Sequence, residues 1–143
     1  MGQSIRDIIE ITRCGVQYRT DKFAPMGLKA CHGSYLTEIC SRPGISQEQL
    51  AKSICINKSN VARQAAALEE GGFVERRACG KDKRIMRLYP TEKTLALLPE
   101  IERIMDCWQT YLLQDLTTEE HLQLESMLQR MKQRASAYME EDP

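Results

Sequence analysis

Apolar side chains recur every three or four residues along most of this chain, which is the repeat of amphipathic helices. The pattern predicts six helices, at residues 4–22, 28–40, 47–54, 58–70, 91–112 and from 117 onward. Two short strands are predicted at 74–77 and 85–89, joined by a charged loop that bends at Gly80. The sequence therefore predicts a mainly α fold with one small β-hairpin.

Residues with helix-capping chemistry mark where the central helices begin and end. Ser46 has a glutamine three positions later, Gln49, which is the spacing of a capping box. Asn57 is suited to cap the next helix because its short side chain can accept a hydrogen bond from the first turn. Gly71 and Gly72 predict the end of that helix, since glycine adopts a left-handed C-terminal cap without strain.

The chain has 143 residues and no net charge, but its charges are unevenly distributed. Residues 55–94 hold nine Lys or Arg and five Asp or Glu, whereas residues 95–143 hold four and ten. A basic middle beside an acidic end is expected of a protein that meets phosphates with one face only. No apolar run approaches the roughly 20 residues that a membrane helix needs, so we expect a globular, cytoplasmic protein.

Cysteine and histidine usage argues against several classes of site. The six cysteines contain no C-x-x-C pair, and only His32 and His121 are available as imidazole ligands. We therefore expect no disulfide framework, no bound metal and no cofactor. The sequence has no Walker loop, no G-x-G-x-x-G motif and no Ser, His and Asp set typical of hydrolases, so we do not expect an enzyme.

The helix predicted at 58–70 has a small, polar outer face. Val61, Ala65 and Leu68 fall on one side, which must pack inward. The other side and its edge carry Ser59, Asn60, Arg63 and Gln64. Arg63 is suited to a bidentate contact with guanine, and Asn60 or Gln64 to one with adenine. Ser59 lies near the helix N-terminus, where a phosphate is favoured.

The loop at 80–84 is the second predicted contact element. A cationic hairpin beside such a helix can follow the DNA backbone or enter a narrow minor groove. Because phosphate repels Asp82, we expect its carboxylate to hold Arg84 or Lys83 in an ion pair. For the helix and the loop alike, the alternative is an ordinary solvated surface. The predicted DNA-contacting residues are Ser46, Gln47, Lys58, Ser59, Asn60, Arg63, Gln64, Lys81, Asp82, Lys83 and Arg84.

These segments together resemble a MarR-type winged-helix regulator. The resemblance is carried by ISQEQLA at 45–51, NKSNVAR at 57–63 and GFVER at 72–76. The wing signature of the family, D-x-R followed by a leucine and a threonine, is similar to Asp82, Arg84, Leu88 and Thr91. The start of the last helix, LTTEE at 116–120, resembles the family as well. The resemblance implies a winged helix-turn-helix, a homodimer formed through the first and last helices, and binding to a pseudo-palindromic DNA operator.

Two positions depart from the family pattern. Cys55 stands where the family commonly has a turn glycine, so we expect a slightly different turn. Tyr89 and Pro90 precede the threonine of the wing signature and are expected to shorten the second wing strand. Neither departure removes a predicted DNA-contacting residue.

The terminal helices carry apolar stripes that a winged unit alone cannot cover. We therefore divide the single domain, residues 1–143, into a winged helix-turn-helix unit at 28–94 and dimerisation helices at 1–27 and 95–143. A symmetric partner is the simplest cover for these stripes, which include several methionines of the last helix. The alternative is a monomer whose terminal helices fold back on the core.

The resemblance also implies a small aromatic or lipophilic effector between the dimer helices and the winged unit. Candidate contacts are Cys14, Tyr18, His32, Tyr35 and Trp108, although each can equally be an ordinary core or surface residue. Cys14 and Tyr18 also resemble the C-x-x-x-Y pattern of the hydroperoxide-sensing branch of the family. In that alternative the tyrosine hydroxyl would hydrogen-bond the thiolate and raise its reactivity. The residues between the two, GVQ, depart from that branch.

The sequence thus predicts a dimeric, sequence-specific transcriptional regulator, acting as a repressor that a small-molecule ligand releases from DNA. Two other functions stay open. A winged-helix protein-interaction module without DNA binding predicts that Arg63→Ala and Arg84→Ala leave function intact. A thiol enzyme built on Cys14 or Cys31 with His32 would need a geometry that sequence adjacency alone does not supply.

Overall fold

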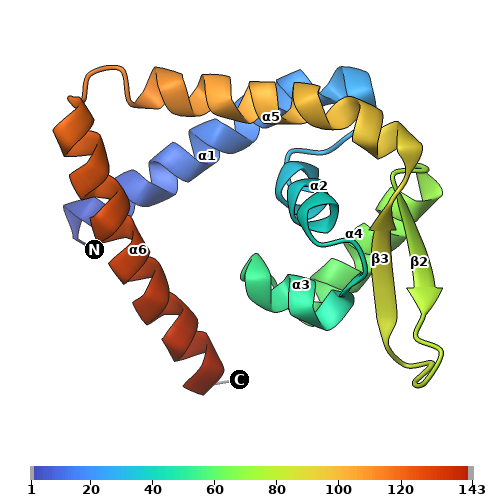
Figure 1. Cartoon of the computed structure of the whole chain (residues 1–143). Helices are drawn as coiled ribbons and strands as arrows, with labels where there is room; N and C mark the ends of the chain where they lie inside the picture. The colour runs from blue at the N-terminus through green and yellow to red at the C-terminus, as the bar shows by residue number, and fades with distance from the viewer. Residues whose placement is uncertain (1, 142–143) are drawn as a thin grey trace. The chain divides into compact units, whose positions relative to one another are not determined.

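The computed structural model describes residues 2–141 and is mainly helical with one small sheet (Figure 1), which confirms the predicted fold class. The elements follow in this order: α1 (Gln3–Phe23), a 3-10 turn η1 (Ala24–Met26), α2 (His32–Ser41), β1 (Ile45–Ser46), α3 (Gln47–Ser53), α4 (Lys58–Glu70), β2 (Val74–Ala78), β3 (Met86–Pro90), α5 (Glu92–Leu112) and α6 (Thr118–Glu141). Helix α4 has the bounds that the sequence predicts. Within the described residues, every helix is too short or too polar to cross a bilayer.

The sheet has three antiparallel strands in the order β1–β3–β2. Strands β2 and β3 form the predicted hairpin, in which Val74 pairs with Pro90. The prediction that Tyr89 and Pro90 shorten the second strand is wrong, because Pro90 stands at the end of β3, where a missing N–H interrupts little of the ladder. Strand β1 was missed. It pairs Ile45 with Leu88, but two residues are too short to show an alternating pattern.

Helix α2 begins at His32, four residues later than the apolar spacing predicts. Gly27 adopts a left-handed backbone with φ 75°, and the chain then turns before the helix starts. In this turn the His32 N–H donates to the Lys29 carbonyl oxygen at 3.0 Å, and the Lys29 N–H donates to His32 Nδ1 at 3.0 Å. Leu28 is buried, as its spacing suggests, but a turn and not a helix brings it into the core.

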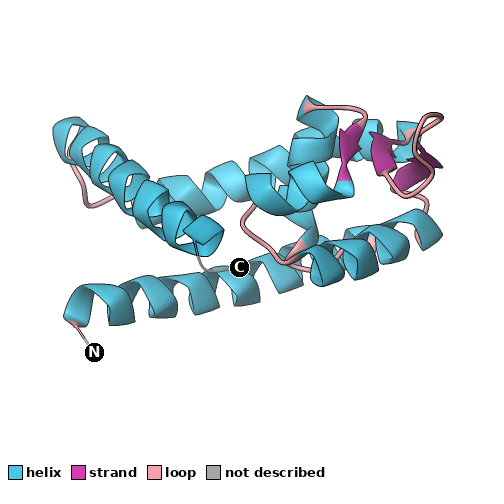
Figure 2. Ribbon diagram, turned by 90° about the horizontal axis from the view of Figure 1, so that it is seen from below, coloured by secondary structure: helices cyan, strands magenta, loops and turns pink. Residues whose placement is uncertain are grey.

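The hydrophobic core lies where α2, α3 and α4 meet the sheet and the inner sides of α1 and α5. Figure 2 shows the three strands lying together, with helices making up the rest of the regular structure. Each fully buried aliphatic or aromatic side chain contributes about 1.5–3 kcal/mol to folding. The side chains with no exposed surface include Phe23, Leu36, Ile39, Leu50, Val61, Leu68, Leu88 and Ile101.

The chain forms two compact units that divide between Trp108 and Gln109, inside α5. The first unit contains the core and every element from α1 to β3. In the second unit α6 has no buried residue, and its large apolar side chains are exposed: Leu122, Met127, Leu128, Met131, Tyr138 and Met139. The finer division into a winged unit at 28–94 and dimerisation helices on either side stays a prediction.

The turn between α3 and α4 is strained at Cys55. Among the described residues it is the one non-glycine position with a positive φ, 55°. This left-handed backbone suits glycine, and the expected difference of the turn from the family stays a prediction. A side chain in this conformation costs roughly 1–2 kcal/mol.

Replacing Cys55 by glycine is expected to raise the free energy of unfolding by about 1 kcal/mol. Glycine relieves the strain of the left-handed conformation, which stabilises the folded chain. Part of this stabilisation is offset because glycine also increases the conformational entropy of the unfolded chain. Urea unfolding of both proteins measures the difference. Cys55→Ala is the matched control, because it removes the thiol and keeps the Cβ. A gain of equal size in both variants would show that the thiol, and not the backbone, carries the cost.

Candidate nucleic-acid interface

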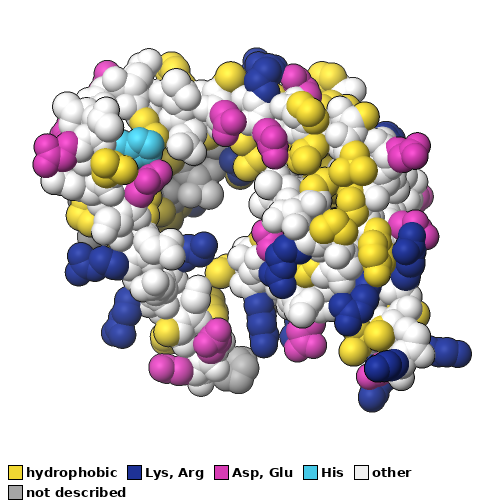
Figure 3. Space-filling model, in the orientation of Figure 1, with side chains coloured by type: hydrophobic (Ala, Val, Ile, Leu, Met, Phe, Trp, Pro, Cys, Tyr) yellow, Lys and Arg dark blue, Asp and Glu magenta, His cyan; other side chains and the backbone are white. Residues whose placement is uncertain are grey.

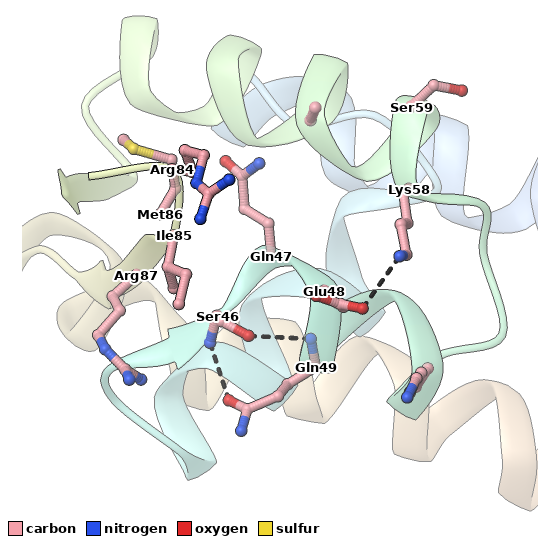
Figure 4. Close-up of a pocket in the computed structure, with 12 residues that line it drawn as sticks. Ser46, Gln47, Glu48, Gln49, Lys58, Ser59, Arg84, Ile85, Met86 and Arg87 are labelled. Carbon is pink, nitrogen blue, oxygen red and sulfur yellow. Dashed lines mark hydrogen bonds and ion pairs between the residues drawn. The ribbon is translucent and has the colours of Figure 1, made fainter. Parts of the chain in front are cut away.

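Side-chain caps define the residues at which α3 and α4 begin. Ser46 Oγ accepts the Gln49 N–H at 3.0 Å, and Gln49 Oε1 accepts the Ser46 N–H at 3.0 Å (Figure 4). This confirms the predicted capping box. Asn57 Oδ1 accepts the Asn60 N–H at 2.8 Å, which confirms the predicted cap of α4. The caps hold the first turn of both helices in a defined direction, so side chains there are well positioned.

Helix α4 buries one face and leaves the other open. Val61, Ala65 and Leu68 have no exposed surface, as the sequence predicts. Ser59 and Arg63 on the opposite side are exposed, and Asn60 beside them is half-buried. Arg63 Nη2 donates to Asn60 Oδ1 at 3.3 Å, so the guanidinium lies along the helix surface with its other N–H groups free to meet a ligand.

A groove runs between the start of α3, the start of α4 and strand β3 (Figure 4). Its volume is about 580 Å³, and its cationic lining residues are Lys52, Lys58, Arg84 and Arg87. It brings together the predicted contacts Ser46, Gln47, Lys58, Ser59 and Arg84. Cations at the rim of an open groove suit an extended polyanion.

Lys52, Arg87 and Glu48 belong to this groove and were missed in the sequence. Arg87 Nη1 donates to the Gly44 carbonyl oxygen at 2.9 Å, which holds it beside the start of β1. Successive side chains of a strand point to opposite faces, so Arg87 lies on the face of β3 opposite to the buried Leu88. This alternation could have been used to predict the position of Arg87 from the sequence. Lys58 Nζ lies 2.9 Å from Glu48 Oε1, and this cation lowers the pKa of the Glu48 carboxyl.

The wing loop between β2 and β3 carries the remaining cations. Asp82 Oδ1 accepts from the Arg84 N–H at 3.0 Å and from Arg84 Nε at 3.1 Å. This is one of the two ion pairs that the sequence suggested, and hydrogen bonds from Arg84 lower the pKa of Asp82. The Arg84 side chain is nevertheless 92% exposed. Figure 3 shows Lys and Arg side chains projecting at the end of the hairpin, so the wing offers a pre-oriented cation to solvent.

Gln64 forms a hydrogen bond with a side chain of α2. Its Oε1 lies 2.9 Å from Nε2 of His32, a side chain that is only 4% exposed. The bidentate contact with adenine predicted for Gln64 needs this oxygen, and in the structure the oxygen is already engaged. No local pattern indicates this hydrogen bond, because the two residues are 32 positions apart.

The five candidate effector contacts fall into two aromatic clusters and one exposed thiol. The Tyr18 and Trp108 rings stack at 4.8 Å between centroids, where α1 meets α5. The His32 and Tyr35 rings meet edge-to-face at 6.4 Å on α2. Cys14 is exposed. None of the five lines the groove described above.

The redox mechanism built on Tyr18 meets a geometric obstacle. Tyr18 donates its hydroxyl hydrogen to the Ile104 carbonyl oxygen at 3.0 Å. A hydroxyl has one hydrogen, so it cannot at the same time donate to a Cys14 thiolate. In the structure described, the Tyr18 hydroxyl hydrogen is therefore engaged away from Cys14, and activation of this thiol stays an untested alternative. Within residues 2–141, His, Cys, Asp and Glu side chains form no group of three that could hold a metal ion.

His32 makes folding stability depend on pH. Burial lowers its pKa from 6.5, and Lys29 adds to this effect, while the hydrogen bond with Gln64 opposes it. Because the unfolded chain binds this proton more readily than the folded chain, stability is lost as the pH falls below about 6.5. Between pH 7 and pH 5.5 the native chain is expected to lose more stability than His32→Asn, because only the native chain carries this imidazole. Urea unfolding at the two pH values measures this, and equal losses would contradict the assignment.

Known proteins resemble this chain over nearly its whole length. A sequence profile of the MarR family matches residues 31–86. The HTH-type transcriptional regulator YybA of Bacillus subtilis (strain 168) is 30% identical over 132 residues, which are 92% of this chain and 88% of YybA. The crystal structure of the transcriptional regulator SlyA superposes with a TM-score of 0.93 at 32% identity, over 97% of this chain and 98% of that one.

A structure of a MarR family regulator from Listeria monocytogenes in complex with 26mer DNA is also similar. Its TM-score is 0.91 at 27% identity, over 99% of this chain and 97% of that one. Helices α3 and α4 form a helix-turn-helix, and strands β2 and β3 form a wing beside it. The similarity to YybA and SlyA indicates the same fold and the same family. The chain belongs to the MarR family of winged helix-turn-helix transcriptional regulators.

Proposed function

We propose that this protein is a homodimeric, sequence-specific DNA-binding regulator that acts on a pseudo-palindromic operator in the cytoplasm. Helix α4 of each protomer enters a major groove, and the wing follows the flanking backbone. The observation that carries the proposal is the exposed, capped outer face of α4, which borders a cation-lined groove of about 580 Å³. The similar regulator from Listeria monocytogenes has been solved with DNA, which supports the same use of the fold here.

The charges around α4 support contact with two parts of the duplex. Ser59 and Lys58 lie in the first turn of α4, where the helix dipole and free N–H groups favour phosphate. Arg63 lies one turn further along, where base edges come within reach. Arg84 is held by Asp82 and reaches into solvent, where its guanidinium can meet phosphates of the flanking backbone.

The terminal helices support a two-fold partner. On α1, Ile5 and Ile11 are each 49% exposed, and α6 buries none of its residues within the single chain. Exposed apolar stripes of this length mark an interaction surface, and a symmetric homodimer covers them with one self-complementary contact. Dimerisation through residues 1–27 and 95–143 would also supply the second α4 that a palindromic site requires.

Release by a small aromatic or lipophilic effector completes the proposal, with the protein acting as a repressor. Tyr35 supports an effector site near α2, because its hydroxyl is buried and has no hydrogen-bond partner among the described residues. The edge-to-face contact with His32 adds an aromatic wall beside it. A buried hydroxyl without a partner is costly, and a ligand acceptor would remove that cost.

Fluorescence anisotropy with the DNA upstream of the protein's own gene tests the proposal. Binding is expected to exceed that of a scrambled duplex of equal length and to weaken steeply with salt. Affinity should fall by roughly 0.9 log unit per log unit of salt for each phosphate contact. Flat titrations at low salt would contradict DNA binding and favour a winged-helix protein-interaction module.

A further inference from the structure

Two half-buried amide side chains, one on the outer side of α4 and one at its edge, have their carbonyl oxygens engaged by the protein itself. Asn60 Oδ1 accepts from Arg63 Nη2 at 3.3 Å, and Gln64 Oε1 lies 2.9 Å from His32 Nε2. An amide whose oxygen is engaged offers mainly its two N–H hydrogens to a ligand. The orientation of each amide therefore decides which base edges α4 can recognise.

The chemistry of the partners determines both orientations. A guanidinium has no acceptor, so the Asn60 atom that faces Arg63 must be its oxygen. The Lys29 N–H donates to His32 Nδ1 at 3.0 Å, so in the neutral ring the hydrogen is on Nε2. Burial lowers the pKa of His32 and keeps the ring neutral. The Nε2–H therefore donates to the Gln64 oxygen.

The bond between His32 and Gln64 is the better protected of the two. His32 is 4% exposed, whereas Arg63 is exposed to solvent. Turning the Gln64 amide round would place its NH2 group against the Nε2–H of His32. Two donors would then face each other at a part-buried contact, and the buried His32 donor would have no acceptor. Gln64 is therefore expected to keep its orientation when a ligand binds.

We propose that Asn60, Arg63 and Gln64 present mainly hydrogen-bond donors on α4, and that this face selects guanine over adenine in the operator. This rests on the proposed DNA-binding function. In the major groove guanine offers two acceptors, N7 and O6, whereas adenine places its N6 amino group beside N7. The pairing of Asn or Gln with adenine needs the amide oxygen, which is engaged here. When a side-chain donor faces the adenine amino group, the affinity of the protein for that duplex is expected to fall about tenfold.

His32 is a positioning residue in this scheme, because it acts on the duplex only through Gln64. Two substitutions separate this role from its role in the turn before α2. Asparagine at position 32 keeps an oxygen close to the place of Nδ1, for the Lys29 N–H, but carries no donor that reaches Gln64. Glutamine is longer and can place an N–H donor close to the position of Nε2. His32→Asn thus frees the Gln64 oxygen, whereas His32→Gln keeps it engaged.

Selection of bound duplexes from a randomised library, followed by sequencing, tests the inference. The position read by Gln64 is the one at which Gln64→Met changes the base preference. The native protein and His32→Gln are expected to prefer guanine there. His32→Asn is expected to shift the ratio of adenine to guanine upward by about five- to tenfold. Gln64→Glu, which presents acceptors in place of donors and does not depend on changing His32, is expected to shift the preference toward adenine or cytosine.

Each other outcome overturns the inference. Adenine preferred by the native protein at that position contradicts it, as does an unchanged preference in both His32→Asn and Gln64→Glu. If Gln64→Met alters no position, Gln64 does not read the duplex. If the native protein enriches no sequence at all, the proposed DNA-binding function itself fails, which is a separate result. Urea unfolding of each variant shows that the selected protein is folded.

Discussion

Replacing Arg63 and Arg84 together by alanine is expected to weaken operator binding by at least about a hundredfold. Arg63 lies on the open face of α4 and can make a bidentate contact with a base edge. Loss of such a contact is expected to lower the binding affinity by about a factor of ten or more at each half-site. Arg84 lies on the wing, 92% exposed and held by Asp82. The two residues belong to separate elements that are proposed to contact different parts of the duplex, so their effects should nearly add.

The single variants are expected to differ in kind. Arg63→Ala should weaken binding and blur the base preference at one position of each half-site. Arg84→Ala should weaken binding to all sequences similarly and reduce the salt slope by about one per protomer. Fluorescence anisotropy against operator variants, at several salt concentrations, separates the two patterns.

Arg103→Ala is the matched control for the pair. Arg103 is also an arginine in a surface ion pair, with Glu100 at 2.6 Å, but it lies on α5 outside the groove and the wing. Its loss should leave operator affinity within about twofold. Operator binding that survives the double substitution would rule out the proposed interface and support a protein-interaction module.

Replacing Gly33 by alanine is expected to destabilise the fold by roughly 1–3 kcal/mol, and by valine more. A Cβ at position 33 would lie 2.9 Å from the Phe23 ring and 3.2 Å from Met105 Sδ. Both neighbours come from helices that pack on α2, and Phe23 has no exposed surface. The ring cannot withdraw without opening the core, so the added methyl group must displace a helix.

Urea or thermal unfolding measures the effect of Gly33→Ala. Gly80→Ala in the wing loop is the control, because a Cβ there meets nothing within 4 Å. That change should alter stability by less than about 0.5 kcal/mol. Equal stability of Gly33→Ala and the native chain would mean that α2 packs less closely against α1 and α5 than the structure describes.

Sequence reasoning was most successful where a local rule determines the structure. The capping side chains of Ser46 and Asn57 set the starts of α3 and α4, and a cap acts within a few residues of itself. The inward face of α4 followed from a repeat of 3.6 residues over more than three turns. In the wing, Asp82 is only two residues from Arg84, so their ion pair could be inferred from charge alone.

The features that were missed depend on contacts between distant segments. Strand β1 forms because Ile45 meets Leu88 across the sheet, and nothing within the two residues of β1 indicates this. The start of α2 is delayed by a turn in which the His32 ring accepts a backbone hydrogen bond. The same ring engages Gln64 through its other nitrogen, so the amide oxygen of a residue expected to read adenine already accepts one hydrogen bond. A helical repeat carries no information about such partners.

Methylation protection of guanine N7 by dimethyl sulfate, on the operator duplex, is the decisive measurement. The reagent attacks in the major groove, where α4 is proposed to lie. We expect two clusters of protected guanines on one face of the duplex, centred about one helical turn, roughly 10 base pairs, apart. Both clusters should weaken in Arg63→Ala and remain in Arg103→Ala. A single cluster, or protection that is unchanged in Arg63→Ala, would contradict recognition of DNA by a pair of α4 helices.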